Sequence, residues 1–192
     1  MSLNSFGKKR PRVAVFFSGS GSTLQAVLDH VETLNIVCAF SSKKTALGRV
    51  RCRRQSILEN SFKFPEDFKK TLELLKVKKI DTILCAGFMK ILPLDFVNGF
   101  KGLGPRQSIV NIHPSLLPNY KGLKSAERAY ADKNTLGVTI HDVVEEVDSG
   151  EFFKRLSVLN SNEISKVRLA EAILWLRSGE QQILRSWGSA VA

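Results

Sequence analysis

The sequence NIHP at residues 111–114 places a carboxamide and an imidazole two residues apart at the end of an apolar, β-branched run. Residues i and i+2 of a strand point to the same face, so we expect Asn111 and His113 to border one small volume. Asn can donate a hydrogen bond to an oxygen that becomes negative, and His can transfer protons near neutral pH. The structural alternative is a buried His113 that is satisfied by a backbone carbonyl.

Residues 137–150 are typical of a strand followed by an acidic loop. Most acidic runs are solvated loop charges, and this remains one interpretation of Glu145, Glu146 and Asp148. The other interpretation is that Asp148 folds back and pairs with His113. Such a pair would stabilise the charged imidazole and raise the pKa of His113.

The sequence SGSGST at residues 18–23 lies between a strand-like run and a helical pattern. Glycine lets the backbone approach a ligand closely, and the N–H groups at the start of a helix bind anions. Ser22 and Thr23 would add hydroxyl groups, so the expected ligand is a phosphate. Without a third glycine and an acidic ribose ligand the motif is a poor dinucleotide fingerprint. A helix N-cap with a tight turn is the alternative interpretation.

Short apolar runs rich in β-branched and aromatic residues alternate with helical patterns along the chain. Strands are expected at residues 13–17, 36–40, 82–86, 109–112, 138–142 and 151–156. Helices are expected over residues 24–34, 68–77, 126–131 and 165–176. This alternation predicts an α/β fold with a doubly wound, mostly parallel sheet. Ligands of such sheets bind beyond the carboxyl ends of the strands, where all three motifs lie.

Length and composition favour one globular domain over residues 1–192, with residues 1–11 as a flexible N-terminus. No apolar run approaches the roughly 20 residues that span a bilayer. The apolar run after the basic N-terminal residues ends at once in the glycine-rich turn, so it is no secretory segment. We therefore expect a cytoplasmic protein.

The three cysteines lack any metal-binding spacing, so we expect them to be reduced, with Cys38 and Cys85 in core strands. The net charge of +11 favours anionic ligands, among which phosphorylated metabolites, polyglutamate tails and nucleic acid all qualify. The densest basic stretch, residues 43–54, lacks the aromatic residues of a single-strand stacking surface. We interpret it as a solvated helix face.

Four segments resemble, in order and at similar spacing, the motifs of the glycinamide ribonucleotide transformylase family, the folate-dependent phosphoribosylglycinamide formyltransferases. They are VAVFFSGSGSTLQAVLD, LCAGFMKILPLDFV, NIHPSLLPNYKG and GVTIHDVVEEVDSG, within residues 13–150. The resemblance implies a single-domain, Rossmann-like formyltransferase fold. It also implies transfer of a formyl group from 10-formyltetrahydrofolate, as co-substrate, to the amine of 5'-phosphoribosylglycinamide in de novo purine biosynthesis. From the resemblance we expect small-molecule substrates and a monomer or homodimer. We expect no metal, no specific nucleic-acid partner and no membrane association.

The resemblance also implies residue roles. Catalysis would fall to Asn111, His113 and Asp148. Gly21, Ser22 and Thr23 would bind the substrate phosphate, and Glu171, in the segment VRLAEAILW, would receive the substrate amine. The residues that would bind the formyl-folate are Met89, Lys90, Ile91, Leu92, Asn111, Val144, Glu145, Glu146, Val147 and Asp148.

The chain departs from the family pattern at several positions. Ser20 and Thr23 stand where Asn is common, and Lys90 and Pro65 stand where Arg is common. Residues 101–107 lengthen the connection before the NIHP motif.

Three alternatives remain open. The first is methionyl-tRNA formyltransferase, which would be expected to carry an appended nucleic-acid-binding domain. The second is a formyltetrahydrofolate hydrolase, which would be expected to carry an N-terminal regulatory domain. From a different class, a catalytically silent basic binding module would explain the charge, although charge alone does not explain the placement of the polar motifs.

Overall fold

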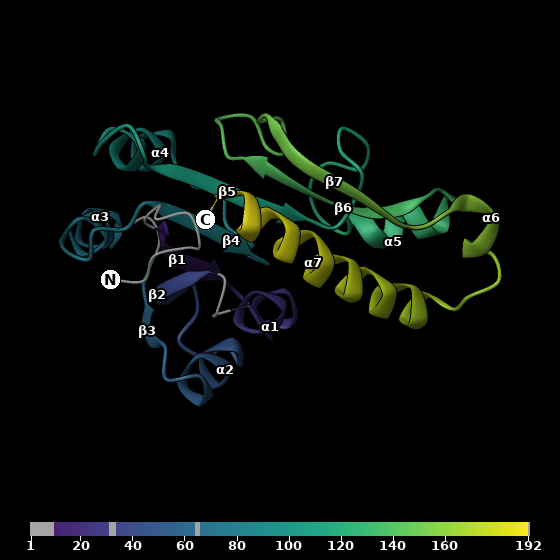
Figure 1. Ribbon diagram of the computed structural model, residues 1–192, viewed down its shortest axis with the longest axis horizontal. Coiled ribbons are helices and arrows are strands. Elements are labelled where there is room, and N and C mark those ends of the chain that lie inside the picture. Colours follow the sequence, from purple (N-terminus) through teal and green to yellow (C-terminus); the bar gives the residue numbers. More distant parts are fainter. Residues whose placement is uncertain (1–9, 31–33, 64–65, 192) are drawn as a thin grey trace.

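The computed structural model describes residues 10–30, 34–63 and 66–191. Its strands are β1 (Arg12–Phe17), β2 (Asn35–Ser41), β3 (Leu58–Ser61), β4 (Thr82–Ala86), β5 (Ser108–His113), β6 (Leu136–Asp142) and β7 (Phe152–Leu159). Within the described residues they form one seven-stranded sheet in the order β3-β2-β1-β4-β5-β6-β7. Strands β1 to β5 pair in parallel, whereas β6 and β7 are antiparallel additions at one edge (Figure 1).

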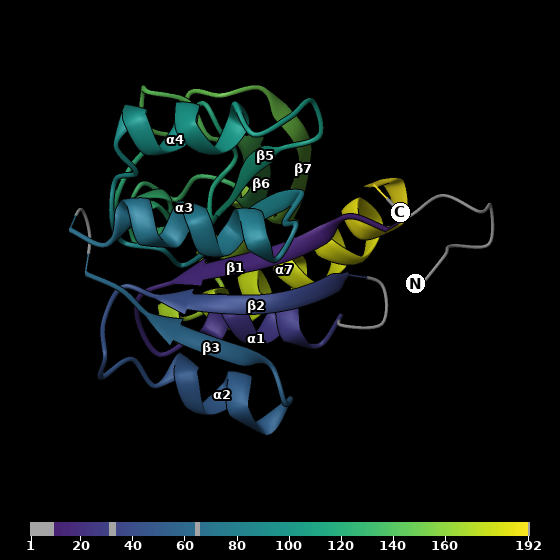
Figure 2. The same cartoon turned by 90° about the vertical axis from the view of Figure 1, so that its left-hand side faces the viewer.

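The helices are α1 (Ser22–Leu28), α2 (Gly48–Arg54), α3 (Phe68–Val77), α4 (Leu94–Lys101), α5 (Ser125–Ala131), α6 (Ser161–Ile164) and α7 (Leu169–Val191). Figure 2 shows α3 and α4 together on one face of the sheet, with α1 and α7 on the other. Because the strand order reverses between β2-β1 and β4-β5, the sheet is doubly wound, which confirms the predicted fold class.

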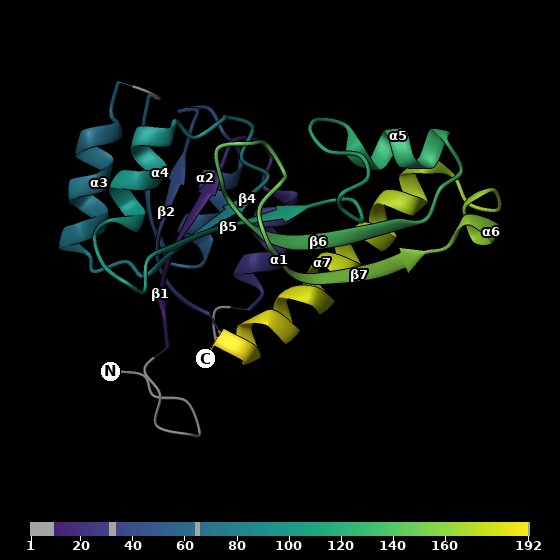
Figure 3. The ribbon, with the colours of Figure 1, turned by 90° about the horizontal axis from the view of Figure 1, so that it is seen from above.

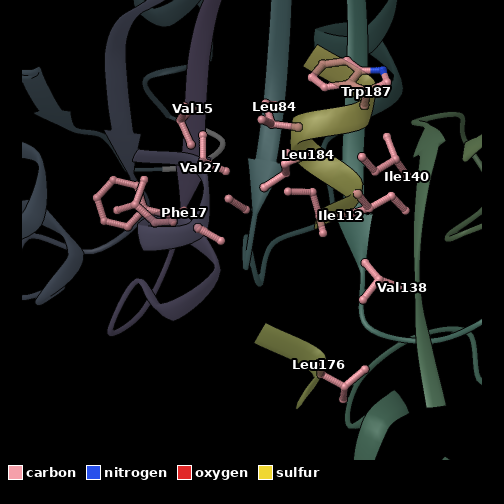
Figure 4. Close-up of a cluster of buried hydrophobic side chains, with 14 of the residues drawn as sticks. Val15, Phe17, Val27, Leu84, Ile112, Val138, Ile140, Leu176, Leu184 and Trp187 are labelled. Atoms are coloured by element: carbon pink, nitrogen blue, oxygen red, sulfur yellow. The ribbon is translucent and has the colours of Figure 1, made fainter. Parts of the chain in front are cut away.

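Strand β1 is buried on both faces, as expected for a parallel sheet covered by two helical layers. Val13, Val15 and Phe17 belong to one core cluster, and Ala14 and Phe16 belong to the other. This alternation follows from the two-residue period of a strand. In the first cluster, side chains of α7 meet those of the sheet and α1 (Figure 4).

The six predicted strands are confirmed within a few residues. Strand β3, which was not predicted, is a short, largely polar edge strand and so lacks an apolar signal. Helix α4 was also missed. The prediction that the last helix ends at Leu176 is wrong, because α7 continues to Val191 with Leu184 and Trp187 still buried. As a whole, α7 packs along β6, β7 and α1 (Figure 3).

Three other expectations can be compared with the structure. Residues 1–9, most of the predicted flexible N-terminus, lie outside the described residues, as do residues 31–33 of the helix predicted over 24–34. Cys38 and Cys85 lie buried in β2 and β4 as free thiols, and burial raises their pKa values to about 11 and about 12. None of the described helices has the length and apolar character that crossing a membrane requires.

Candidate functional site

The side chains of Asn111 and His113, at the end of β5, both meet Asp148. Asn111 Nδ2 lies 3.4 Å from Asp148 Oδ1, and His113 Nδ1 lies 3.2 Å from Asp148 Oδ2. The strand persists through His113, so both side chains point to one face, as predicted. The predicted return of Asp148 onto His113 is confirmed.

His113 is only 4% exposed, and its Nε2 donates a hydrogen bond of 2.9 Å to the carbonyl of Tyr120. The alternative interpretation, a buried His113 that is satisfied by a backbone carbonyl, is therefore correct together with the pairing of His113 and Asp148. Both ring nitrogens face oxygen acceptors, an arrangement that a doubly protonated ring satisfies. Burial nevertheless lowers the pKa of His113, and Asp148 and the Tyr120 carbonyl oppose this effect without cancelling it. The expected rise in pKa is wrong, because the imidazole is buried.

Asp148 remains ionised well below neutral pH. Burial by itself would raise its pKa, but hydrogen bonds from His141 and from the Gly122 N–H, together with the charges of His141 and His113, lower the pKa to about 2. The Gly122 N–H donates to Asp148 Oδ2 over 2.8 Å, which ties the acidic loop to the loop after β5. A fixed negative charge therefore stands beside His113.

His141 completes this cluster and was not assigned a role from the sequence. Its ring is 1% exposed, and Nε2 lies 3.3 Å from Asp148 Oδ1 and 3.2 Å from Asn111 Nδ2. Nδ1 donates to the carbonyl of Asp142 over 2.8 Å, so Nε2 accepts from Asn111 when the ring is neutral. The pairing of Asn111 with His141 across the antiparallel β5 and β6 creates this contact.

The acidic loop after β6 is anchored at both ends. At its start, the Val143 N–H donates to the Ile109 carbonyl over 2.8 Å, and Lys101 Nζ binds the Asp142 carboxylate at 2.7 Å. At its end, a Cβ on Gly150 would lie 2.0 Å from the Asp142 carbonyl oxygen, so a larger residue cannot occupy this position. These contacts define how the loop returns to His113.

The glycine loop follows β1 at the same end of the sheet. Gly21 precedes α1 with a φ of 77°, and a Cβ there would lie 2.8 Å from the Cα of Gly48. Ser22, the first residue of α1, is exposed. The loop can therefore be reached by a ligand at Ser22, while Gly21 has the backbone conformation that favours glycine.

Thr23 does not offer its hydroxyl to a ligand in this structure. Its Oγ1 donates to Glu180 Oε1 over 3.2 Å and accepts from Arg177 Nη1 over 2.7 Å. The expectation that Thr23 adds a free hydroxyl is therefore wrong. Any contact of Thr23 with a phosphate has to come from its backbone N–H, which has no partner within the helix.

Glu180 is the acidic residue of α7 that reaches the glycine loop. It is 1% exposed, burial raises its pKa, and its Oε2 has no hydrogen-bond partner among the described residues. Glu171 is exposed in the first turn of α7, nine residues earlier and therefore about 13 Å away along the helix axis. The segment VRLAEAILW, in which Glu171 was chosen, ends before Glu180. The contact of Glu180 with Thr23 depends on the packing of α7 against α1 and could not be predicted from the sequence.

The two segments expected to bind folate expose apolar side chains. Leu92 and Val143 pack, together with Phe88, against the same core cluster, so both segments lie on one face of the sheet. Lys90, Glu145 and Glu146 are also exposed. The exposed large apolar residues are Met89, Ile91, Val144 and Val147.

Comparisons with known proteins show the family to which this chain belongs. A family model described as formyl transferase matches residues 11–179. The chain belongs to the formyl transferase family.

This formyl transferase is 38% identical over 151 residues to the phosphoribosylglycinamide formyltransferase of Haemophilus influenzae, covering 72% of this chain and 68% of that protein. It is 34% identical over 180 residues to the phosphoribosylglycinamide formyltransferase of Dictyostelium discoideum, covering 81% and 87%. The crystal structure of phosphoribosylglycinamide formyltransferase from Brucella melitensis has a TM-score of 0.78 at 29% identity, covering 94% of this chain and 96% of that chain.

The basic stretch of the formyl transferase is more than a solvated helix face. Arg49 and Arg53 pair with Glu59 at 2.5 and 2.8 Å, and hydrogen bonds from Arg49 help to lower the pKa of Glu59. Arg51 Nε donates to the carbonyl of Ser20 over 2.9 Å and so holds the glycine loop. The solvated-face interpretation fits Arg54, which is exposed, but not Arg51.

Within the ranges that the structure describes, no three His, Cys, Asp or Glu residues gather as a metal-binding group. The polar cluster at β5 and β6 has groups that could bind an oxygen through Asn111, exchange a proton through His113 and hold a negative charge on Asp148.

Proposed function

We propose that this formyl transferase moves the formyl group of 10-formyltetrahydrofolate to the amine of 5'-phosphoribosylglycinamide, as a cytoplasmic enzyme acting on small molecules. The observation that carries the proposal is the contact of Asn111 and His113 with one buried carboxylate, Asp148. Formyl transfer needs a donor for an oxyanion and a group that carries a proton, and this cluster offers both. The named relatives support the choice of substrates.

The reaction begins when the neutral amine attacks the formyl carbon and a C–N bond forms. The formyl oxygen becomes an oxyanion. Asn111 Nδ2 would stabilise it by exchanging its 3.4 Å contact with Asp148 for the oxyanion, and the protonated ring of His113 would stabilise it through its positive charge. The bond to folate N10 then breaks, N10 gains a proton and the new amide nitrogen loses one. The lowered pKa of His113 makes its ring a ready proton donor, while Asp148 stays ionised and stabilises the imidazolium.

The substrate phosphate would bind the glycine loop at Gly21, Ser22 and the backbone of Thr23. For the substrate amine or a nearby hydroxyl we favour Glu180 over Glu171. Glu180 contacts Thr23 and has a buried oxygen without a partner among the described residues, whereas Glu171 is exposed. Buried carboxylate oxygens without partners are costly, and a donor from the substrate would satisfy this one.

The folate would lie across the residues that follow β4 and β6. Met89, Ile91, Val144 and Val147 expose apolar surface there, which a flat heterocyclic ring would cover. Lys90 adds a positive charge close to this surface. Asp148 borders the same loop, so the formyl group would lie next to the catalytic cluster.

The direct test is to incubate the protein with phosphoribosylglycinamide and 10-formyltetrahydrofolate and follow the change in folate absorbance. We expect turnover of the nucleotide. At about 100 times its dissociation constant, the nucleotide should also stabilise the fold by roughly 2.7 kcal/mol. The dephosphorylated nucleoside should stabilise it much less. Equal stabilisation by both compounds would show that the glycine loop only caps the helix and does not bind the phosphate.

The net charge of +11 favours a second candidate, formylation of an aminoacyl-tRNA. Binding of a nucleic acid releases counterions, so affinity would fall with salt at a log-log slope of about 0.7 to 0.9 per phosphate contacted. For a substrate with one phosphate we expect a slope of about one or less in KM between about 50 and 200 mM salt. Preferential formylation of methionyl initiator tRNA over the nucleotide would establish the second candidate instead.

A further inference from the structure

Residues 120–122, in the loop after β5, contact both members of the pair of His113 and Asp148. The carbonyl of Tyr120 accepts a hydrogen bond from His113 Nε2 over 2.9 Å. Two residues later, the N–H of Gly122 donates to Asp148 Oδ2 over 2.8 Å. The segment therefore fixes the imidazole and the carboxylate relative to each other.

Lys121, the middle residue of this segment, contacts the acidic loop after β6 on both sides of Asp148. Its Nζ donates to Glu146 Oε1 over 3.2 Å and to Ser149 Oγ. Ser149 and Lys121 lower the pKa of Glu146, so this carboxylate is ionised at neutral pH. Within the described residues, no other residue outside the acidic loop forms a hydrogen bond with residues 144–147. The middle of the loop therefore depends on Lys121 for its polar attachment to the protein.

The segment itself is fixed to α5 and to the turn that follows this helix. Arg128 Nη2 donates to the carbonyl of Lys121, and the Arg128 guanidinium lies 5.8 Å from the centroid of the Tyr120 ring. The Tyr120 hydroxyl donates to Asp132 Oδ2 over 3.0 Å. Residues 120–122 are therefore a fixed support against which the acidic loop can be held.

The backbone of Asp148 adopts a conformation that needs such support. Its φ is 53°, in the left-handed region that residues other than glycine adopt rarely. A conformation of this kind persists when the surrounding contacts determine it. Because Lys121 contacts the residue that follows Asp148, we expect the loss of this contact to let the loop relax and the carboxylate move away from His113.

We propose that Lys121 is a positioning residue that holds Asp148 against His113 by fixing the acidic loop. The inference rests on the proposed function, in which Asp148 stabilises the protonated ring of His113. The ammonium group of Lys121 donates to the acidic loop and not to His113, so its effect on the chemical step passes through Asp148.

The experiment measures kcat and both KM values for formyl transfer with the whole 192-residue chain. In Lys121→Met we expect kcat to fall by about 3- to 10-fold, the size of one hydrogen bond and one exposed ion pair, with the nucleotide KM unchanged. Lys121→Arg keeps the charge and should recover most of kcat. In the Asp148→Asn background, Lys121→Met should lower kcat no further, because the carboxylate that it positions is absent.

The matched control is Lys124→Met, which changes an exposed lysine of the same loop and should retain kcat. An unchanged kcat in Lys121→Met, an equal loss in the control, or a rise in the folate KM alone would each overturn the inference. So would an additive loss in the Asp148→Asn background, which a merely structural role would produce. All of these results leave formyl transfer by the wild type established, whereas absence of transfer by the wild type would overturn the proposed function as well.

Discussion

The proposed catalytic cluster of Asn111, His113, His141 and Asp148 lies at the same end of the sheet as the glycine loop, but the two regions are built in opposite ways. In the cluster, His113, His141 and the Asp148 side chain are nearly inaccessible to water and contact one another or backbone groups. In the glycine loop, Ser20 and Ser22 are exposed. The comparison indicates that the groups proposed to transfer protons are preorganised, whereas the loop proposed to bind the phosphate is open to a ligand.

The difference has an electrostatic consequence. Burial removes water from around the cluster and lowers the pKa of His113, whereas hydrogen bonds and the nearby imidazoles lower the pKa of Asp148 to about 2 in spite of its burial. At the loop, positive charge comes from Arg51 and Arg177, which also contact solvent. Substitutions in the cluster should therefore affect the chemical step most, and substitutions at the loop should affect binding.

The largest effect is expected in the cluster. His113→Ala and Asp148→Asn should each lower kcat by about 100-fold to 1,000-fold, because each removes a group that acts on the transition state. Steady-state kinetics checks this, with circular dichroism to verify the fold. The matched control Asp95→Asn changes an exposed carboxylate in the first turn of α4 and should retain full activity. Near-normal turnover in either cluster variant would remove that residue from catalysis.

A smaller effect is expected on stability at low pH. The pKa of Asp148 is depressed from 3.8 to about 2 in the folded protein, so its ionised form stabilises the fold above pH 3.8. This contribution, about 2 kcal/mol, should be lost as the pH falls from about 4 to about 2. Urea unfolding of the wild type and Asp148→Asn between pH 6 and pH 2 measures it. The free-energy difference between them should shrink on acidification; a constant difference would contradict the low pKa.

The smallest effect is expected at the loop and compares two acidic residues of α7. Glu180→Gln should raise KM for the nucleotide by about 10-fold with little change in kcat, because it weakens binding rather than the chemical step. Glu171→Gln, in an exposed position on the same helix, should leave both constants unchanged. The reverse result would assign the substrate contact to Glu171 and show that the buried Glu180 has only a structural role beside Thr23.

The sequence alone determined the fold class and indicated Asn111 and His113 as candidate catalytic residues, because both inferences depend on short-range patterns. Apolar runs at strand and helix spacing are local, so the strands and the doubly wound sheet could be predicted. Asn111 and His113 lie two residues apart on one strand, so their shared face also follows from local geometry. Edge strand β3 could not be predicted because its polar residues carry no periodic signal.

The tertiary structure decided which distant residues meet and how far their side chains are buried from solvent. His141 reaches Asn111 only through the register of β5 and β6, and Glu180 reaches Thr23 only because α7 packs along α1. The sign of the pKa shift of His113 was wrong in the sequence analysis for the same reason. A charge partner can be inferred from residue types, but desolvation depends on all the atoms that surround the ring, and these are contributed by segments far apart in the chain.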